Sequence, residues 1–204
     1  MKGPTIRPVT LADAGPLAEL HIASWRWAYP GIVPQGVLDA LDPAKRAAEY
    51  PAWWAESRAK GRFDLLAEEA GELLGFAAGG PHRAWVGVQA PPSARAEDGA
   101  GGTSLPLAGE GLARGQSFEG ELYAVYLEER ALGRGLGRAL VREAFKGLHE
   151  RGFRNAAVWV LEKNLRARGF YERLGARLLP LRKTITIGIP LDEVAYGWDT
   201  LELA

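Results

Sequence analysis

Residues 121–152 read ELYAVYLEERALGRGLGRALVREAFKGLHERG, and this stretch combines three local signals. Residues 122–127 are apolar or aromatic on both alternating faces, which predicts a strand in the middle of a sheet. From Leu136 onward, apolar residues recur at helical spacing, and Gly152 can cap the end of that helix. Three glycines at alternate positions separate the two elements: Gly133, Gly135 and Gly137. The stretch therefore predicts a strand, a glycine-rich turn and an amphipathic helix in direct succession.

The segment between this strand and this helix has the properties of an anion-binding site. The first amides of a helix have no partner within the helix, and the helix dipole favours negative charge beside them. Glycines let a ligand approach the backbone closely. Arginines, which suit bidentate phosphate contacts, recur every fourth residue along one flank: Arg134, Arg138 and Arg142. We therefore expect a phosphate-bearing cofactor, and a tight connection without any ligand is the competing interpretation.

The glycine spacing narrows the class of cofactor. The dinucleotide pattern Gly-x-Gly-x-x-Gly fails in both registers, because Arg138 or Leu140 occupies the position of the third glycine. A Walker loop fails too, because the chain contains no Gly-Lys-Ser or Gly-Lys-Thr. The segment resembles motif A of the GNAT superfamily of N-acetyltransferases, which reads Gln or Arg, two residues, Gly, one residue, and Gly or Ala. In that family the loop holds the pyrophosphate of acetyl coenzyme A.

Motif A fits this chain in two registers. Read from Arg130, the two glycines of the motif are Gly133 and Gly135. Read two residues later, they are Gly135 and Gly137, and Leu132 replaces the usual Gln or Arg. We favour the second register, because the loop then runs directly into the helix, as it does in the family. In this register Arg130 has no assigned role.

A second resemblance to the same superfamily follows the next predicted strand, residues 156–161. Motif B of the family reads Asn-x-x-Ala-x-x-Phe-Tyr-x-x-x-Gly, and every anchor is present: Asn164, Ala167, Phe170, Tyr171 and Gly175. The family's usual Phe after the last glycine is Ala176 here, a departure that concerns packing more than chemistry. Two motifs in the expected order and spacing are far more specific than either alone.

The chain length predicts a single domain over residues 1–204. The resemblance implies an α/β (α+β) fold: a mixed, mostly antiparallel central sheet with flanking helices and one parallel strand-helix-strand crossover. Residues 81–119, rich in Gly, Ala, Pro and Ser, are expected to form a flexible insertion, or, if ordered, a cover over the acceptor pocket. Further strands are expected at residues 5–9, 63–68, 72–79, 178–189 and 193–201, and further helices between 10 and 30, at 34–41 and at 43–60.

The composition excludes several functional classes. Lysine plus arginine equals aspartate plus glutamate, so the chain lacks the basic excess of a nucleic-acid or membrane-surface binder. No apolar stretch approaches the roughly 20 residues that span a bilayer and no signal peptide is visible, so we expect a cytoplasmic protein. With no cysteine there is no thiolate metal site, and no metal is expected. The preference for arginine over lysine is compatible with a thermophilic source or with GC-rich coding.

The resemblance also implies how the cofactor is held. In the family the strand before motif A splays away from the strand before motif B, and the pantetheine arm pairs with the exposed edge of the first. By resemblance this edge runs from Val125 to Leu127, and the amide near Leu127 would meet the acetyl carbonyl. The amides of residues 132–139 would cradle the pyrophosphate, beside Arg134 and Arg138.

Three side chains are candidates for catalytic or positioning roles. Tyr171 matches the family's tyrosine that protonates the departing thiolate, a task that suits a phenol with a pKa near 10; a packed core tyrosine is the competing interpretation. Asn164 matches the position that hydrogen-bonds the pantetheine arm, and a plain helix cap is equally open. Glu121 is the candidate general base, acting directly or through water, unless it is an ordinary exposed strand residue.

The acceptor side is less defined. The segment Trp-x-x-x-Tyr-Pro-Gly, which contains Trp25 and Tyr29, resembles the opening of small-molecule GNAT enzymes, where it walls the acceptor site. We expect Tyr123 to line the same pocket and His21 to be a packed histidine. The sequence does not distinguish an antibiotic, polyamine, amino acid, peptide N-terminus or protein lysine as acceptor. It does not fix the oligomeric state either, and a homodimer is compatible with it.

The predicted function is transfer of an acetyl group from acetyl coenzyme A to a primary amine, by direct attack in a ternary complex. The alternative is a GNAT-like module that binds coenzyme A or another nucleotide as a sensor, without turnover. A nucleotide-dependent oxidoreductase is disfavoured, because the dinucleotide fingerprint fails.

Overall fold

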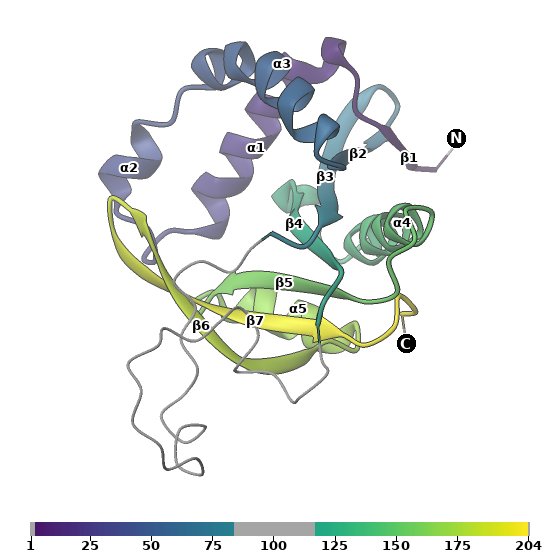
Figure 1. Ribbon diagram of the computed structural model, residues 1–204. Coiled ribbons are helices and arrows are strands. Elements are labelled where there is room, and N and C mark those ends of the chain that lie inside the picture. Colours follow the sequence, from purple (N-terminus) through teal and green to yellow (C-terminus); the bar gives the residue numbers. More distant parts are fainter. Residues whose placement is uncertain (1–2, 84–116, 204) are drawn as a thin grey trace.

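The computed structural model describes residues 3–83 and 117–203 (Figure 1). Their strands form a seven-stranded sheet in the order β1-β2-β3-β4-β5-β7-β6. The strands are β1 (Thr5–Pro8), β2 (Phe63–Glu69), β3 (Glu72–Pro81), β4 (Gly120–Leu127), β5 (Ala156–Leu161), β6 (Arg177–Ile187) and β7 (Ile189–Trp198). The α-helices are α1 (Ala14–Ala28), α2 (Gln35–Asp39), α3 (Pro43–Ala59), α4 (Leu136–His149) and α5 (Leu165–Arg173). The mixed, mostly antiparallel sheet with flanking helices confirms the predicted fold class.

Strands β4 and β5, which α4 connects, form the one parallel pair among the described strands. They pair over a short distance, Gly120–Leu122 with Ala156–Val158. Beyond this point β4 continues to pair with β3 as far as Leu127, while β5 continues to pair with β7 as far as Leu161. The two strands therefore diverge, and the edge of β4 that faces β5 is open over its second half.

A bulge in β4 lies where the two strands separate. Ala78 of β3 pairs with Ala124 and Gly79 pairs with Leu122, so Tyr123 has no partner of its own on β3. An extra residue in one strand bends that strand and increases its local twist. The bulge thus accompanies the turn of β4 away from β5.

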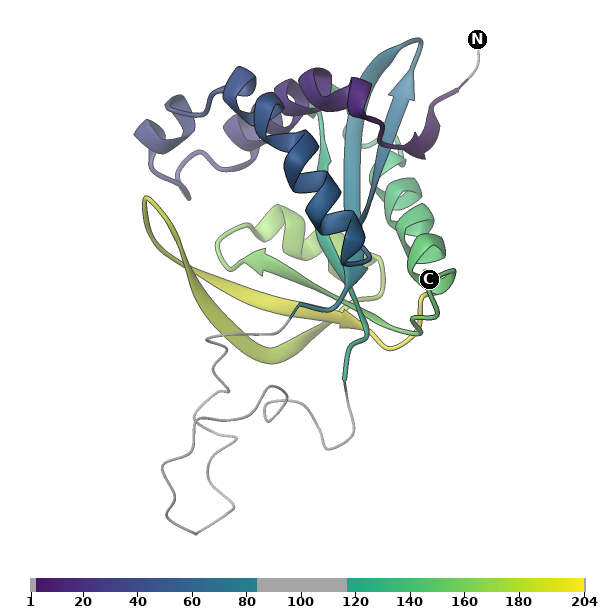
Figure 2. The same ribbon diagram turned by 45° about the horizontal axis from the view of Figure 1, so that its top comes forward.

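The helices cover both faces of the sheet. Figures 1 and 2 show α1 and α3 gathered on one side of β2 and β3, and α4 on the other. Helix α4 buries the apolar stripe that its sequence predicts, including Leu140, Phe145 and Leu148. Tyr171 and Leu174, from the region of α5, join the same core as this stripe. The sheet is therefore a central layer, and the splayed end of β4 and β5 lies between the two helical layers.

Strands β6 and β7 form a hairpin that reaches α2 (Figure 1). The sequence predicts strands at residues 178–189 and 193–201, whereas β7 already begins at Ile189. The prediction is wrong here because Gly188, with φ at 72°, makes a tight turn. A Cβ atom on Gly188 would lie 2.5 Å from Cγ2 of Val37, so the tip of the hairpin packs closely against α2.

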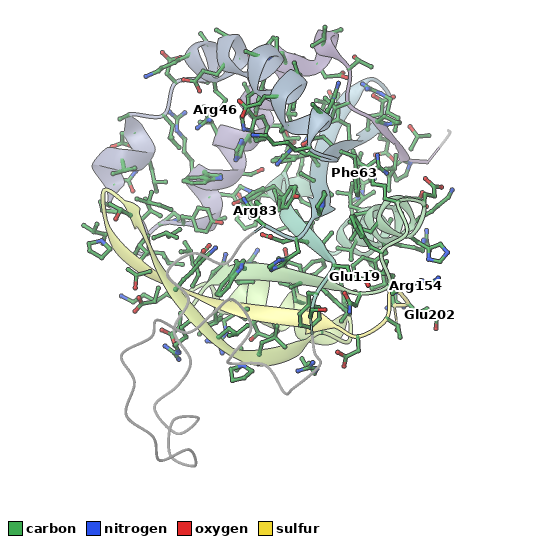
Figure 3. The ribbon with its side chains drawn as sticks, in the orientation of Figure 1. Arg46, Phe63, Arg83, Glu119, Arg154 and Glu202 are labelled. Atoms are coloured by element: carbon green, nitrogen blue, oxygen red, sulfur yellow. The ribbon has the colours of Figure 1, made fainter. Side chains whose placement is uncertain are left out.

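Most of the predicted insertion at residues 81–119, namely residues 84–116, lies outside the described part of the chain. At one end Pro81 belongs to β3 and pairs with Gly120. At the other end the Glu119 carboxylate accepts a hydrogen bond of 2.7 Å from the backbone N–H of Arg154, and Figure 3 shows these two residues side by side. Both described ends therefore belong to the sheet region. In the described ranges every helix is too short or too polar to cross a bilayer.

Candidate active site

A cavity of about 960 Å³ opens where β4 and β5 diverge. We call its two parts the loop half and the aromatic half. Val125 and Leu127 of β4 lie between them. The loop half is lined by the β4–α4 loop, the first turn of α4 and the facing side of α5: Leu132, Gly133, Gly135, Gly137, Arg138, Asn164, Ala167, Phe170 and Tyr171. The aromatic half is lined by Tyr29, Tyr123, Tyr126, Trp159, Leu161 and Glu193.

Two of the three glycines shape the loop half directly. Gly133 and Gly135 have φ angles of 72° and 78°, which side-chain-bearing residues rarely adopt. Among the described residues, no heavy atom lies within 4 Å of the position that a Cβ would take on either glycine. Gly135 is also the N-cap of α4, so the first amides of this helix open onto the same space. This end of the cavity can therefore accept an anion against the backbone.

Gly137 has a different role. It lies inside the first turn of α4, where a Cβ would be 3.0 Å from Cε2 of Phe170 and 3.4 Å from Cδ1 of Leu127. The missing side chain lets α4 approach α5 and β4 closely. Gly137 thus allows the walls of the loop half to pack together, and this packing explains why a glycine occupies the position.

The arginines near the loop differ in their placement. Arg138 lines the cavity, and Arg142 is exposed on α4. Arg134 forms an ion pair of 2.6 Å with Glu69, at the turn of the β2–β3 hairpin. Arg130 pairs at 2.6 Å with Glu72 on the other side of the same turn. The acidic hairpin turn therefore holds two of the arginines beside the loop.

The open edge of β4 offers backbone groups to a ligand. The N–H of Glu128 donates to a β3 carbonyl at 2.9 Å, and successive residues of a strand alternate sides, so the groups of Leu127 point away from β3. In agreement, the Leu127 carbonyl accepts hydrogen bonds from Ser24 Oγ at 3.2 Å and from Trp27 Nε1 at 3.1 Å. The N–H groups of Leu127 and of Val125, two residues earlier, therefore face the gap.

Tyr171 and Asn164 come from opposite ends of α5. The pKa of Tyr171 is raised well above its ordinary value, mainly by burial and to a smaller extent by the nearby Tyr29. Its ring packs edge-on against Phe170, with 5.1 Å between centroids, so the phenol is held in place. Asn164 Oδ1 accepts a hydrogen bond of 3.1 Å from the N–H of Ala167 and caps α5. Asn164 thus combines a cap with a place on the cavity wall.

Tyr29, which follows α1, is the centre of the aromatic half. Its hydroxyl and that of Tyr126 on β4 are 2.8 Å apart and share a hydrogen bond. Trp25 packs edge-on against Tyr29, with 5.1 Å between centroids, and is absent from the described cavity lining. The structure therefore brings Tyr29 and Tyr123 to the cavity, whereas Trp25 packs behind Tyr29.

His21 lies directly behind the aromatic half. Its ring packs against Tyr126, with 5.4 Å between centroids, and its Nδ1 is 2.9 Å from the hydroxyl of Tyr50. The pKa of His21 is lowered to about 4, mainly by burial and to a smaller extent by the positive charges of Arg46 and Arg62. The ring is therefore neutral at neutral pH, in agreement with a packed histidine.

Glu121 is not placed as a general base. Its side chain is only 1% exposed and forms an ion pair with Arg83. Glu121 also accepts hydrogen bonds from Nε and from the backbone N–H of Arg83, at 3.1 and 3.0 Å, and it is absent from the described cavity lining. Arg83 in turn lies 4.4 Å from the centroid of the Tyr123 ring, and Figure 3 shows it between the helical layer and β5. Since both carboxylate oxygens are engaged by Arg83, the prediction of a direct proton acceptor is corrected.

Sequence reasoning missed three side chains at the far wall of the aromatic half. Glu193 of β7 and Trp159 of β5 line the cavity. Lys183 of β6 forms an ion pair of 3.2 Å with Glu193, and its Nζ lies 4.3 Å from the centroid of the Trp159 ring. Nothing in the local sequence marks these residues, because they meet only through the strand order β5-β7-β6.

The cavity thus combines an open strand edge, a glycine-rich helix N-terminus and a second compartment. This arrangement fits an acyltransferase with a phosphate-bearing donor. The Acetyltransferase (GNAT) family matches residues 21–176, and the chain belongs to this family. As a member it is an acetyltransferase, and its cofactor is acetyl coenzyme A.

Two named relatives differ in how much of their length this chain spans. N-acetyltransferase YuaI of Bacillus subtilis is 29% identical over 197 residues, which is 97% of this chain and 94% of that protein. Mycothiol acetyltransferase of Amycolatopsis mediterranei is 35% identical over 141 residues, which is 69% of this chain but 36% of that protein. The likeness to the second relative therefore concerns about a third of a longer protein.

Solved structures share the fold over nearly the whole chain. PaiA N-acetyltransferase from Thermoplasma acidophilum, in complex with coenzyme A, has a TM-score of 0.65 at 18% identity and covers 97% of this chain and 100% of its own. An N-acetyltransferase from Staphylococcus aureus Mu50 has a TM-score of 0.61 at 17% identity and covers 98% and 100%. At these identities the likeness concerns the fold.

Proposed function

We propose that the protein transfers the acetyl group of acetyl coenzyme A directly to a primary amine, with donor and acceptor bound at the same time. The observation that carries this proposal is that one cavity joins the loop half and the aromatic half through the gap between β4 and β5. The donor can occupy one half while the acceptor occupies the other. The chain contains no cysteine that could carry the acetyl group as a thioester between two half-reactions.

The loop half fits a pyrophosphate-bearing cofactor. The space beside Gly133 and Gly135 admits phosphate oxygens against the N-terminus of α4, where backbone amides and the helix dipole both attract them. Gly137 contributes by allowing the close approach of Phe170. When bound, the cofactor supplies an acetyl thioester. We propose the following contacts for it: Val125, Leu127, Leu132, Gly133, Arg134, Gly135, Gly137, Arg138 and Asn164.

Backbone groups and one phenol support the chemistry. We propose that the N–H of Leu127, which faces the gap, donates to the acetyl carbonyl oxygen, where negative charge develops during attack. Tyr171 keeps its proton at neutral pH, because burial raises the pKa of its phenol. We propose that this proton passes from the Tyr171 hydroxyl to the departing sulfur.

The aromatic half is the proposed acceptor site. Tyr29 and Tyr123 form two of its walls, and Trp25 supports Tyr29 from behind. We propose a positioning role for Glu121, because its ion pair holds Arg83 over the ring of Tyr123. Aromatic walls bind the apolar part of an amine acceptor.

Calorimetry and a thiol-release assay test the proposal together. Titration with acetyl coenzyme A should show binding, and a panel of primary amines should include at least one that releases coenzyme A thiol and gains an acetyl group by mass spectrometry. No binding at high micromolar concentration would overturn the proposed function. Binding without thiol release for any amine would instead support a sensor module without turnover.

A further inference from the structure

Glu193, Trp159 and Lys183 meet at the wall of the aromatic half that β5 and β7 form, and we call this group the Glu193 corner. Glu193 of β7 pairs with Leu161 of β5, and Trp159 lies two residues before Leu161 on the same face of that strand. Leu161 packs in one cluster with Tyr29, so this face looks into the aromatic half. Both Glu193 and Trp159 line the cavity.

The Glu193 corner already holds one alkylammonium group. Lys183 Nζ lies 3.2 Å from Glu193 Oε2 and 4.3 Å from the centroid of the Trp159 ring. A carboxylate and the face of an indole both attract a cation, and the attraction grows when solvent is excluded. The side chains of Lys183 and Glu193 are only 20% and 15% exposed. The corner is therefore complementary to a primary ammonium at the end of an alkyl chain.

Other described carboxylates are less well placed to meet an acceptor. The described cavity lining includes two of them, Glu129 and Glu193. Glu129 is exposed in the loop that follows β4, on the side of the loop half. Glu121 is held by Arg83 outside the described lining. Glu193 is thus the carboxylate that faces the aromatic half.

We propose that the Glu193 corner is the subsite for the primary ammonium of the acceptor, and that Glu193 takes the proton which this ammonium loses before attack. The inference rests on the proposed function, because it concerns the acceptor of the same reaction. In this step one N–H bond breaks, one O–H bond forms on Glu193, and the nitrogen keeps the electron pair. Glu193 then releases the proton to solvent. The acceptor class is a primary alkylamine whose chain packs against the aromatic walls.

Lys183 competes with the acceptor in this arrangement. One carboxylate and one ring face serve both ammonium groups, so the acceptor must displace Lys183. Replacing Lys183 by methionine keeps a flexible side chain of similar length but removes the competing charge. The Lys183→Met variant should therefore bind an alkylammonium more tightly than the wild type.

The probe is n-hexylammonium, with 1-hexanol as its uncharged counterpart, titrated into the full chain by calorimetry with and without coenzyme A. Glu193→Gln keeps the shape of the side chain and removes its charge, so n-hexylammonium should bind about tenfold more weakly or worse, while 1-hexanol is unaffected. Lys183→Met should bind n-hexylammonium several-fold more tightly. Asp192→Asn is the matched control: Asp192 is exposed on the same strand and bonded to Thr184, and this variant should bind like the wild type.

Equal affinity of the wild type and Glu193→Gln for n-hexylammonium would overturn the inference, and so would a Lys183→Met variant that shows no gain. Titration of the same variants with acetyl coenzyme A separates this result from the proposed function. Glu193→Gln should bind acetyl coenzyme A as the wild type does. If the wild type itself does not bind acetyl coenzyme A, the proposed function fails, whatever the Glu193 corner binds.

The proton-accepting role has a separate readout. Once an accepted amine is found, analogues whose ammonium groups have lower pKa values can be tested. A larger fraction of each such analogue binds as the neutral amine, which has no proton to lose. The deficit in kcat/KM of Glu193→Gln should therefore shrink along this series. A deficit that stays constant across the series would overturn the proton transfer and would limit Glu193 to binding.

Discussion

The two halves of the cavity are built in opposite ways. The loop half comes largely from one contiguous stretch and presents backbone amides, two left-handed glycines and a helix N-terminus. The aromatic half comes from Tyr29 after α1 and from β4, β5 and β7. It presents side chains that contact one another, such as the Tyr29–Tyr126 hydroxyl pair.

Under the proposed function, this difference separates the donor side of the cavity from the acceptor side. Backbone groups recognise a phosphate and a thioester arm in much the same way whatever side chains surround them. An acceptor is recognised by particular side chains, which can change without disturbing the loop. Perturbing one half at a time should therefore separate donor binding from acceptor binding.

The largest effect is expected from Gly135→Val in the loop half. The new side chain would project into the space beside the N-terminus of α4, which is open among the described residues. Affinity for acetyl coenzyme A should fall at least about 100-fold, or about 2.7 kcal/mol. Calorimetry should show no change for n-hexylammonium in the aromatic half.

Gly152→Val is the control for this substitution. Gly152, just beyond the other end of α4, also has a positive φ, 88°, and no described heavy atom near its Cβ position. Both variants should lose about 1–2 kcal/mol of folding stability from backbone strain. Equal loss of cofactor affinity in the two variants would show that strain, and not the loop, is responsible.

Tyr171→Phe in the loop half should separate chemistry from binding. Turnover should fall about 100-fold if the phenol supplies the proton, while affinity for acetyl coenzyme A changes less than about twofold. Thiol release and calorimetry measure the two quantities. Tyr196→Phe is the control, because the Tyr196 hydroxyl is bonded to Arg168 and Glu172 and lies outside the described lining. Unchanged turnover in Tyr171→Phe would remove the acid role.

The folding stability of the protein should depend on pH through His21, which packs behind the aromatic half. The pKa of His21 is about 4 in the folded state and near 6.5 when unfolded, so the unfolded state binds more protons in between. Stability should therefore fall by about 2.6 kcal/mol as pH drops from 6.5 to 4, and this loss should level off below about pH 3. Denaturant unfolding across this range measures it. In His21→Leu the unfolding free energy should change less steeply with pH between 6.5 and 4. An unchanged slope would contradict the assignment of this pH dependence to His21.

The smallest effect is expected at the rim of the loop half. Glu69→Gln breaks the ion pair between Glu69 and Arg134. Because both side chains are partly exposed, the folding stability should change by less than about 1 kcal/mol. The released guanidinium should raise affinity for acetyl coenzyme A at most about threefold, with a steeper salt dependence. Calorimetry at two salt concentrations measures this, and weaker binding would show that Glu69 orients Arg134 toward the ligand.

Most elements of the fold were predictable because their periodicities are strong and local. Strand β5 has the predicted bounds, and α4 begins at the predicted Leu136. The start of β7 was predicted wrongly, because the residues 178–201 show no break in strand pattern at the two-strand turn, which is made by Gly188 and packs closely against Val37 of α2. The helix predicted at residues 43–60 is present as α3, although Pro51 inside it disfavours a helix locally.

By itself, the sequence determined the backbone of the loop half, a glycine turn that leads into a helix N-terminus, because φ preference and helix termini are properties of neighbouring residues. Only the tertiary structure decided the rest. In it, Gly137 packs against Phe170, and Glu121 forms a buried ion pair with Arg83. It also brought Lys183, Glu193 and Trp159 together from three strands. Long-range strand pairing sets these contacts, and no local pattern records which strands become neighbours.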